Sequence, residues 1–136
     1  MVRNICRNIL ILSQKAQAAT KEDAGIGQDL LDTLKANQER CVGMAANMIG
    51  VSKAIIVVNV GPADMLMYNP VIMKRSDPYQ AEEGCLSLDG IRKTQRFKDI
   101  VVEYQDENWV RQRRNFSGWT AEIIQHECDH LQGKII

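Results

Sequence analysis

The sequence has no excess of either charge: Lys and Arg together number 17, Asp and Glu together number 17, and the formal net charge at pH 7 is zero. Proteins that hold nucleic acid through its phosphates usually carry clustered positive charge. The densest basic run, RQRR at Arg111–Arg114, follows DENW and is typical of a charged β-hairpin tip. We therefore expect no nucleic-acid partner.

Long hydrophobic runs are also absent, although 45% of the residues are hydrophobic. No apolar segment approaches the roughly 20 residues that a membrane-spanning helix needs. The apolar stretch Ile9–Leu12 near the start is too short for the core of a signal peptide, and no small-residue cleavage site follows it. The sequence predicts a cytoplasmic protein with no membrane partner, and it does not indicate an oligomeric state.

Cysteine occurs at only four positions, and no segment is repeated, of low complexity, or rich in Gly, Pro and Ser. In a chain without a signal peptide, four cysteines indicate buried thiols or metal ligands rather than disulfides. A length of 136 residues suits one domain. We expect a single domain that spans residues 1–136.

Two segments have helical periodicity. Thr20 is a helix N-cap with Asp23 three residues later, and leucines at 30, 31 and 34 follow at helical spacing. The segment GWTAEIIQHECDHLQG predicts a second helix, which begins at Gly118 and closes at Gly133. One helix thus lies in the N-terminal part of the chain and one near the C-terminus.

The segments between these helices indicate strands. KAIIVVNV (53–60) is a β-branched run that predicts a buried strand, and MLMYNPVIMKRS (65–76) predicts a strand broken at Asn69-Pro70. Residues 98–116 alternate, turn at 106–108 and return, which is typical of a β-hairpin. Together with the two helices, these strands predict an α+β fold.

Histidine occurs only twice, and both histidines lie in the motif HECDH at 126–130. Residues i and i+4 lie on one face of a helix, so His126 and His130 can bind one metal ion, with Glu127 near a metal-bound water. The alternatives are coincidence and a structural histidine pair that caps the helix. We interpret the motif as part of a catalytic metal site.

A catalytic site of this kind needs three protein ligands and an open position. Only LQGKII follows His130 and it contains no ligand, so the third ligand must lie upstream, among cysteines and carboxylates. In EEGCLSLDG (82–90), Cys85 is favoured because a thiolate suits iron or zinc. Taken alone, this cysteine would more often be a small buried side chain, but the need for an upstream ligand favours a metal ligand.

Three segments resemble the peptide deformylase family. HECDHLQG (126–133) resembles its HExDHLxG motif, EGCLS (83–87) matches its EGCLS motif at every position, and CVGMAANMIG (41–50) is a degenerate form of GxGLAAxQxG. The resemblance implies a fold in which the C-terminal helix packs among antiparallel strands and hairpins. Because this chain ends soon after the last motif, we expect a short version of that fold.

The resemblance also implies the chemistry. Cys85, His126 and His130 would hold the metal, natively Fe²⁺, with Zn²⁺, Ni²⁺ or Co²⁺ able to substitute. Glu127 would be the general base, and the backbone N–H of Leu86 would stabilise the oxyanion. The substrates would be N-formylmethionyl nascent peptides, with formate as a product. An ion pair between Glu83 and Arg96 would fix the cysteine loop.

Several further residues are expected around the substrate. Backbone groups near Gly43, and in the strand that precedes Cys85, would hold an extended peptide by strand addition. Trp119 and Ile123 are candidate apolar walls, although ordinary core packing is the alternative for both. The complete set of predicted substrate-binding residues is Val42, Gly43, Met44, Met48, Glu83, Trp119, Glu122 and Ile123.

The resemblance breaks down at three positions. The family glutamine that donates to the oxyanion is replaced by Met48, which cannot donate a hydrogen bond. The neighbouring Asn47 has an amide, but adjacent side chains in an extended loop point to opposite sides. Cys41 replaces the first motif glycine. Glu122 stands where the family tends to place an aliphatic residue; it could favour polar substrates, or it could point to solvent or pair with an arginine.

Three functions remain open at this point. The first is a deformylase, favoured because the ligands and the general base are all present. The second is a catalytically weak relative that binds metal and peptide N-termini, favoured by Met48. The third is an enzyme that removes another small N-acyl group, favoured by the changes at Cys41 and Glu122.

Overall fold

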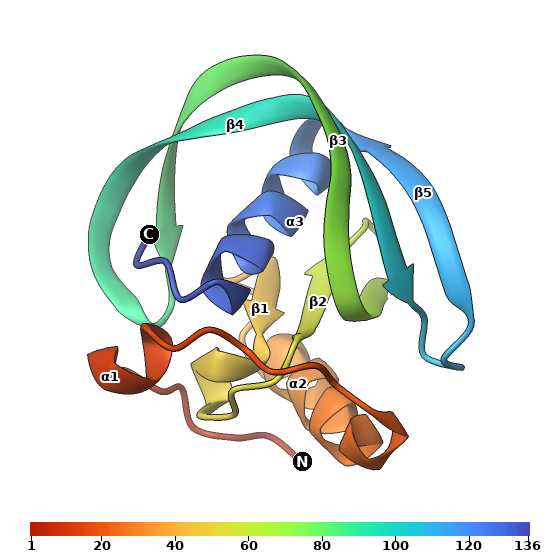
Figure 1. Ribbon diagram of the computed structural model, residues 1–136. Coiled ribbons are helices and arrows are strands. Elements are labelled where there is room, and N and C mark those ends of the chain that lie inside the picture. The colour runs from red at the N-terminus through yellow and green to blue at the C-terminus, as the bar shows by residue number, and fades with distance from the viewer.

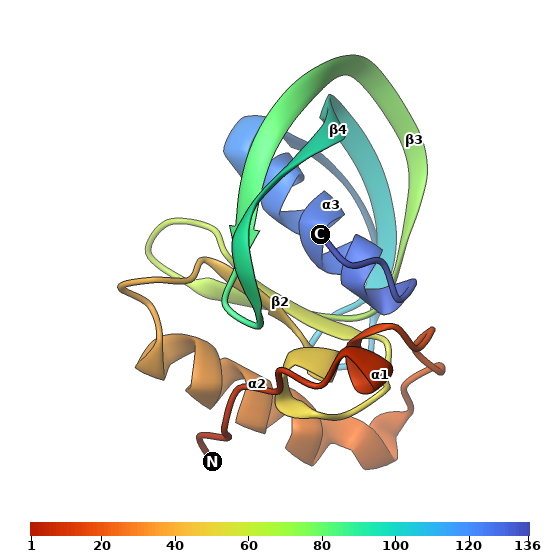
Figure 2. The ribbon, with the colours of Figure 1, turned by 90° about the vertical axis from the view of Figure 1, so that its left-hand side faces the viewer.

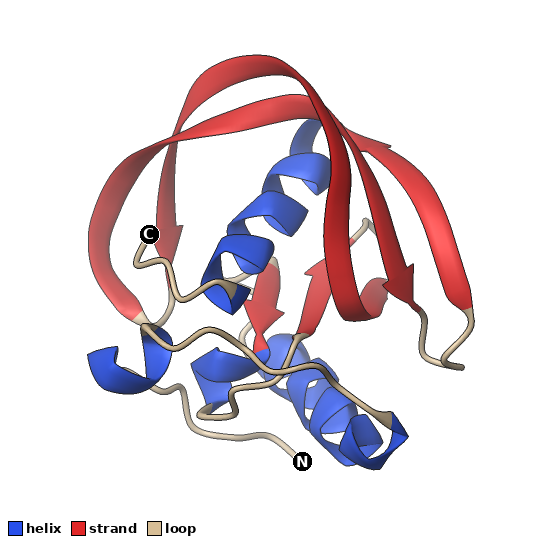
Figure 3. Ribbon diagram, viewed as in Figure 1, coloured by secondary structure: helices blue, strands red, loops and turns tan.

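The computed structural model describes all residues from 1 to 136 and contains a sheet of five antiparallel strands in chain order, β1 to β5. Figure 3 distinguishes the helices, strands and loops. The helical elements are α1 (Ile9–Leu12), the 3-10 helix η1 (Lys21–Asp23), α2 (Ala24–Ala36), the 3-10 helix η2 (Ala46–Ile49) and α3 (Gly118–Leu131). The strands are β1 (Gly43–Ala45), β2 (Ile55–Asn59), β3 (Asp64–Cys85), β4 (Leu88–Gln105) and β5 (Arg111–Ser117). No helix is both long enough and apolar enough to cross a membrane.

Strand β2 is buried on both faces, which explains its continuous run of β-branched residues. Ile56 and Val58 pack in a core with α3, whereas Ile55 and Val57 pack on the opposite face in a core with α2. This alternation follows from the two-residue period of a strand. Figure 1 shows α2 below β1 and β2, and α3 on their other side.

Strands β3 and β4 form a long, curved hairpin that arches over α3 (Figures 1 and 2). Their pairing runs from Tyr68 opposite Gln105 to Cys85 opposite Leu88. The curvature carries the end of β3 back toward the C-terminal helix, so that Cys85 approaches the HECDH motif. The sequence pattern did not predict this length, because most residues of β3 after Val71 are exposed and do not alternate between apolar and polar.

Asn69-Pro70 does not break the strand, contrary to the sequence prediction. The β3–β4 register shifts between Tyr68 and Val71, so the pair forms an irregularity inside a continuous strand. Asn69 adopts a left-handed conformation with φ of 52°. Its side-chain amide donates to the carbonyl of Ala19 at 3.0 Å and to Gln105 at 2.9 Å. These bonds hold the chain through the point at which proline cannot donate.

Both predicted helices are confirmed. Thr20 precedes the 3-10 helix η1, and its N–H donates to the Asp23 carboxylate at 2.8 Å, whereas its side chain makes no cap hydrogen bond. In α2, Gly27 permits a close contact, because an added Cβ would lie 2.2 Å from the hydroxyl oxygen of Tyr68. Helix α3 begins at Gly118 and ends at Leu131, and Gly133 follows with φ of 77°. The short helices α1 and η2 were not predicted.

The basic run 111–114 lies on strand β5 and not at a hairpin tip, contrary to the sequence prediction. The turn that joins β4 to β5 spans 106–110, where the Asp106 carboxylate accepts from the backbone N–H groups of Asn108 and Val110. Asp106 therefore shapes the turn as a side-chain cap. Three of the four residues in the basic run are exposed, as expected for a solvated face.

Candidate metal centre

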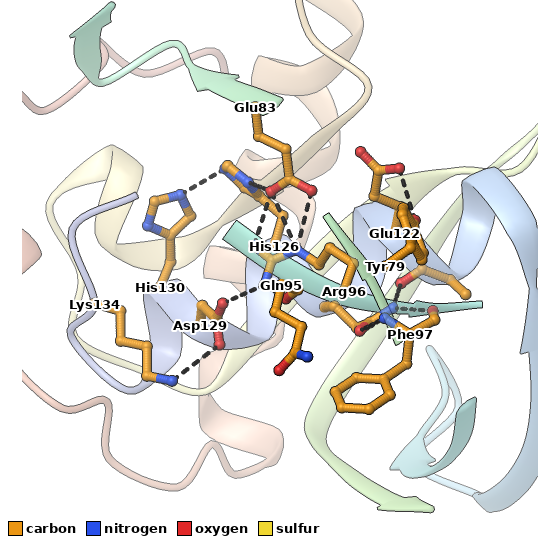
Figure 4. Close-up of polar contacts among 12 residues, drawn as sticks. Tyr79, Glu83, Gln95, Arg96, Phe97, Glu122, His126, Asp129, His130 and Lys134 are labelled. Atoms are coloured by element: carbon orange, nitrogen blue, oxygen red, sulfur yellow. Dashed lines mark hydrogen bonds and ion pairs between the residues drawn. The ribbon is translucent and has the colours of Figure 1, made fainter. Parts of the chain in front are cut away.

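The three predicted ligands come together at one point, although they lie on two different elements. Cys85 is the last residue of β3, whereas His126 and His130 lie one turn apart on α3. Their ligand atoms all lie within 4.8 Å of one another. The Nε2 atoms of the two histidines face each other at 3.0 Å (Figure 4). This arrangement confirms the spatial proximity predicted from the sequence.

The donor set fits a single transition-metal ion. One thiolate and two imidazoles provide three ligands, which leaves a fourth position in a tetrahedral site. The two facing Nε2 atoms can both direct lone pairs at one cation. Beside them, Oε1 of Glu127 is buried and has no hydrogen-bond partner. A buried acceptor of this kind is suited to a metal-bound water.

His126 is oriented by a buried chain of charged groups (Figure 4). Its Nδ1 lies 2.7 Å from Oε1 of Glu83. The guanidinium of Arg96 donates to Glu83 at 2.8 and 3.0 Å and to Asp129 at 2.6 Å. Such contacts fix the ring orientation of a metal ligand. The expected Glu83–Arg96 ion pair is therefore present, and Asp129 is a partner that the sequence analysis missed, although it lies within the HExDH motif.

This network changes the interpretation of Glu83, which was predicted to bind substrate. Glu83 borders the site, but its carboxylate is occupied by His126 and Arg96. Burial by itself raises the pKa of Glu83, whereas the contacts with His126 and Arg96 outweigh burial and lower the pKa to about 2. Glu83 thus orients His126, and its carboxylate is engaged by protein groups rather than free to contact substrate.

Glu127 lies next to the first histidine and is 4% exposed. Burial raises the pKa of its carboxyl group to about 7. A carboxylate with a raised pKa, within a site that can hold water, is suited to proton transfer near neutral pH. The position of Glu127 therefore agrees with its predicted role.

A hollow of about 450 Å³ opens in front of these groups. The predicted residues that line it are Val42, Gly43, Met48, Glu83, Cys85, Leu86, Trp119, Glu122, Ile123, His126 and Glu127. The lining also includes Arg40, Cys41, Glu82, Gly84 and Gly90, and Cys41 is the residue that replaces the first glycine of the GxGLAAxQxG motif. Met44 differs from the other predicted residues, because its fully buried side chain packs in the core on the α2 side. Any role of Met44 in binding a peptide is therefore restricted to its backbone.

The wall formed by η2 has no side-chain amide. Met48 lines the hollow, and its sulfur atom lies 3.5 Å from the backbone nitrogen of Ala45. Asn47 points elsewhere: its Nδ2 donates to the carbonyl of His130 at 3.0 Å. The amide of Asn47 therefore does not replace the missing glutamine.

The wall formed by α3 contains apolar and charged residues. Trp119 is 61% exposed and lines the hollow, so ordinary core packing does not describe it. Ile123 is buried and belongs to the core with α3 as well as to the hollow. Glu122 neither points freely to solvent nor pairs with an arginine, because it accepts a hydrogen bond from the hydroxyl of Tyr79 at 2.9 Å. Tyr79 was not identified from the sequence.

A Cys–His–His ligand group on a helix and a neighbouring strand, with a buried glutamate beside it, defines a mononuclear metal-dependent hydrolase. The polypeptide deformylase family model matches residues 5–136. The chain belongs to the peptide deformylase family.

Individual relatives agree with this assignment. A peptide deformylase of Clostridium beijerinckii is 53% identical over 136 residues, which cover all of both chains. One from a Picosynechococcus species is 36% identical and covers 90% of this chain and 70% of that protein. The crystal structure of peptide deformylase from Thermotoga maritima is 29% identical, has a TM-score of 0.89, and covers 99% of this chain and 95% of that chain.

Proposed function

We propose that this protein removes the formyl group from N-formylmethionyl peptides by hydrolysis and releases formate. The observation that carries the proposal is the position of Glu127, buried next to three convergent metal ligands in a member of the peptide deformylase family. A protein that only bound metal or peptides would have no chemical need for this carboxylate. The general base therefore favours an enzyme.

Cys85, His126 and His130 would hold the ion, which we propose is natively Fe²⁺, with Zn²⁺, Ni²⁺ or Co²⁺ able to substitute. When bound, the ion supplies Lewis-acid activation of a water molecule and of the formyl oxygen. Glu127 accepts a proton from the water and passes it to the departing amine. The backbone N–H of Leu86 donates to the oxyanion at the former formyl oxygen. Glu83 and Arg96 keep the ring of His126 in place.

The peptide would bind in extended form along β1. This strand is at one end of the sheet order, so one of its edges has no paired strand. Backbone groups at Gly43 can therefore bond an additional strand, with Val42 and Leu86 beside it in the hollow. One solved relative, a peptide deformylase of Acinetobacter baumannii with 26% identity, is described in complex with Met-Ala-Ser. Such a peptide corresponds to a deformylated product.

Met48 supports a second candidate, a catalytically weak relative that binds metal and peptide N-termini. Without an amide on η2, the oxyanion has one fewer donor, and loss of one such donor reduces turnover by roughly 10²–10³ in other enzymes. A third candidate, removal of another small N-acyl group, is favoured by Cys41 and Glu122 in the hollow. We consider both of these candidate functions less well supported than deformylation.

The decisive experiment measures formate release from a short N-formylmethionyl peptide. The protein is prepared anaerobically and loaded with Fe²⁺, and Glu127→Ala is the matched control. Turnover in the wild type that is lost in the control supports the deformylase. If metal is bound but no formate appears, peptides with other N-acyl groups distinguish the third candidate from the second.

We further propose that the enzyme meets nascent peptides in the cytoplasm, because formylated chains are substrates as they are made.

We also propose that residues 1–136 act as one domain. Helix α3 contacts β1, β2, β4 and β5, so the C-terminal helix packs against most of the sheet. Sedimentation and limited proteolysis would test the oligomeric state and the domain boundary.

A further inference from the structure

Glu122 is a charged residue in the lining of the hollow. It lies one turn before His126 on α3, and the neighbouring residues Trp119 and Ile123 are apolar. An unpaired carboxylate on such a wall would be poorly suited to an unbranched apolar side chain, because ionised groups lose solvation when apolar groups cover them. The structure nevertheless gives this carboxylate a specific partner.

That partner, Tyr79, lies outside the hollow. Its hydroxyl donates to Oε1 of Glu122 at 2.9 Å, whereas none of its atoms contributes to the lining. The hydrogen bond therefore turns one carboxylate oxygen of Glu122 toward Tyr79, which does not line the hollow; the labelled side chains in Figure 4 show this contact. Glu122 still contributes to the lining, with this oxygen engaged by Tyr79.

The position of Tyr79 is fixed by the surrounding strands. Tyr79 on β3 pairs with Arg96 on β4. The next residue on β4, Phe97, is bonded through both its N–H and its carbonyl to the side-chain amide of Gln125, at 2.9 and 2.8 Å. Because Gln125 lies on α3, this amide sets the register of α3 against the β3–β4 hairpin, and with it the distance between Tyr79 and Glu122.

The groups around Glu122 shift the pKa of its carboxyl group in opposite directions. Burial raises the pKa of Glu122, the hydrogen bond from Tyr79 lowers it, and the nearby carboxylate of Glu83 raises it again, with a net upward shift. Glu83 is itself occupied by Arg96 and His126. Arg96 is a cation that lowers the pKa of Glu122, but its guanidinium is occupied by Glu83 and Asp129, so a Glu122 side chain released from Tyr79 would be free to turn into the hollow.

We infer that Tyr79 is a positioning residue for substrate selection, which keeps one oxygen of the Glu122 carboxylate turned toward β3 so that an unbranched apolar residue fits in the hollow. This inference rests on the proposed function, because it assigns the hollow to the side chain of the formylated residue. Removal of the Tyr79 hydroxyl releases a hydrogen-bond acceptor into the hollow. The hollow then favours substrate side chains that can donate, such as glutamine, over methionine.

The test compares formyl-Met-Ala-Ser with formyl-Gln-Ala-Ser in the Fe²⁺-loaded wild type and in Tyr79→Phe. We expect KM for the methionine peptide to rise about three- to tenfold in Tyr79→Phe, the range for loss of one hydrogen bond, while kcat stays the same. KM for the glutamine peptide should fall. In Tyr79→Phe/Glu122→Leu, no carboxylate remains to be released, so the preference for methionine should return.

Tyr104→Phe is the matched control, because it removes the same group from a tyrosine that packs in the core with α3 and does not line the hollow. It should leave the ratio of kcat/KM for the two peptides unchanged. An unchanged ratio in Tyr79→Phe, or a double variant that fails to restore it, would overturn the inference.

A direct binding measurement separates this inference from the proposed function. Calorimetry with the Zn²⁺-loaded protein compares the product-type peptides Met-Ala-Ser and Gln-Ala-Ser, without any need for turnover. If the wild type releases no formate but the affinity ratio shifts in Tyr79→Phe and recovers in the double variant, the deformylase proposal fails and the positioning role stands. An affinity ratio that does not shift refutes the positioning role, whatever the turnover.

Discussion

Gly43 on β1 lies directly against Glu127 on α3. A Cβ added at Gly43 would lie 2.9 Å from Oε2 of Glu127 and 2.6 Å from Cγ2 of Ile123. Both distances are too short for a real contact, so any side chain here forces β1 and α3 apart or displaces the carboxylate. Gly43, at the second glycine position of the GxGLAAxQxG motif, is thus explained by the close approach of β1 to α3.

Gly43→Ala should therefore impair catalysis more than folding. A shift of about 1 Å in a catalytic group can cost about 100-fold in rate, and we expect a loss of kcat of this order with the metal content unchanged. Gly25→Ala is the control, because an added Cβ at Gly25 meets no atom within 4 Å. Steady-state formate release and metal analysis provide the measurements. Full activity in Gly43→Ala would mean that Glu127 tolerates displacement and would weaken its assignment as the general base.

Met48→Gln should increase turnover. The substitution places an amide donor on the wall where the buried sulfur of Met48 now lies. Loss of one oxyanion donor costs roughly 10²–10³ in turnover, and we expect a new, imperfectly placed donor to restore about tenfold in kcat. Met48→Leu adds no donor and distinguishes the hydrogen bond from a change of shape. An equal gain in both variants would contradict the explanation.

Removal of the metal should lower the melting temperature. An ion that binds only the folded chain stabilises it by about 3 kcal/mol when its free concentration is about 100-fold above its Kd. Chelation should reverse this gain in the wild type, whereas Cys85→Ala should show neither stoichiometric binding nor a shift on chelation. Cys6→Ala is the control, because Cys6 is a free cysteine outside the ligand group. One tightly held ion in Cys85→Ala would show that the ligand assignment is wrong.

Arg96→Met should destabilise the fold strongly. Arg96 is 3% exposed and bonds both Glu83 and Asp129, so its loss leaves buried charge without a partner. Breaking such a pair costs about 3–5 kcal/mol, whereas Arg113→Met, which breaks a more exposed pair with Glu103, should cost about 0–1 kcal/mol. The free energy of unfolding of both variants is measured by urea unfolding in the presence of chelator, so that bound metal does not contribute. Similar losses in the two variants would contradict a structural role for the buried network.

The elements of the site that belong to one helix could be predicted from the sequence. His126 and His130 are neighbours because helical periodicity places residues four apart on one face. The same local rules gave the start of α3 at Gly118 and the strand at β2. The position of the third ligand could be restricted to the segments before the HECDH motif, because LQGKII contains no side chain that commonly binds metal.

Contacts between distant elements depended on the tertiary structure. The sequence predicted a strand at 65–76 and a hairpin at 98–116, which is β4–β5, but it did not predict that β3 and β4 pair. The curvature of the β3–β4 hairpin is what brings Cys85 to α3. The bonds from Arg96 to Asp129 and from Tyr79 to Glu122 also join different elements. Met44 was predicted at the site, but strand alternation in β1 directs its side chain to the opposite core.

The sequence by itself therefore determined the candidate metal ligands, the glutamate beside them and the family, since each is encoded in a short motif. The tertiary structure alone decided which wall of the hollow each remaining side chain occupies and which partner restrains it. The physical reason is that residue spacing specifies neighbours within one element, whereas strand curvature, register and packing specify neighbours between elements.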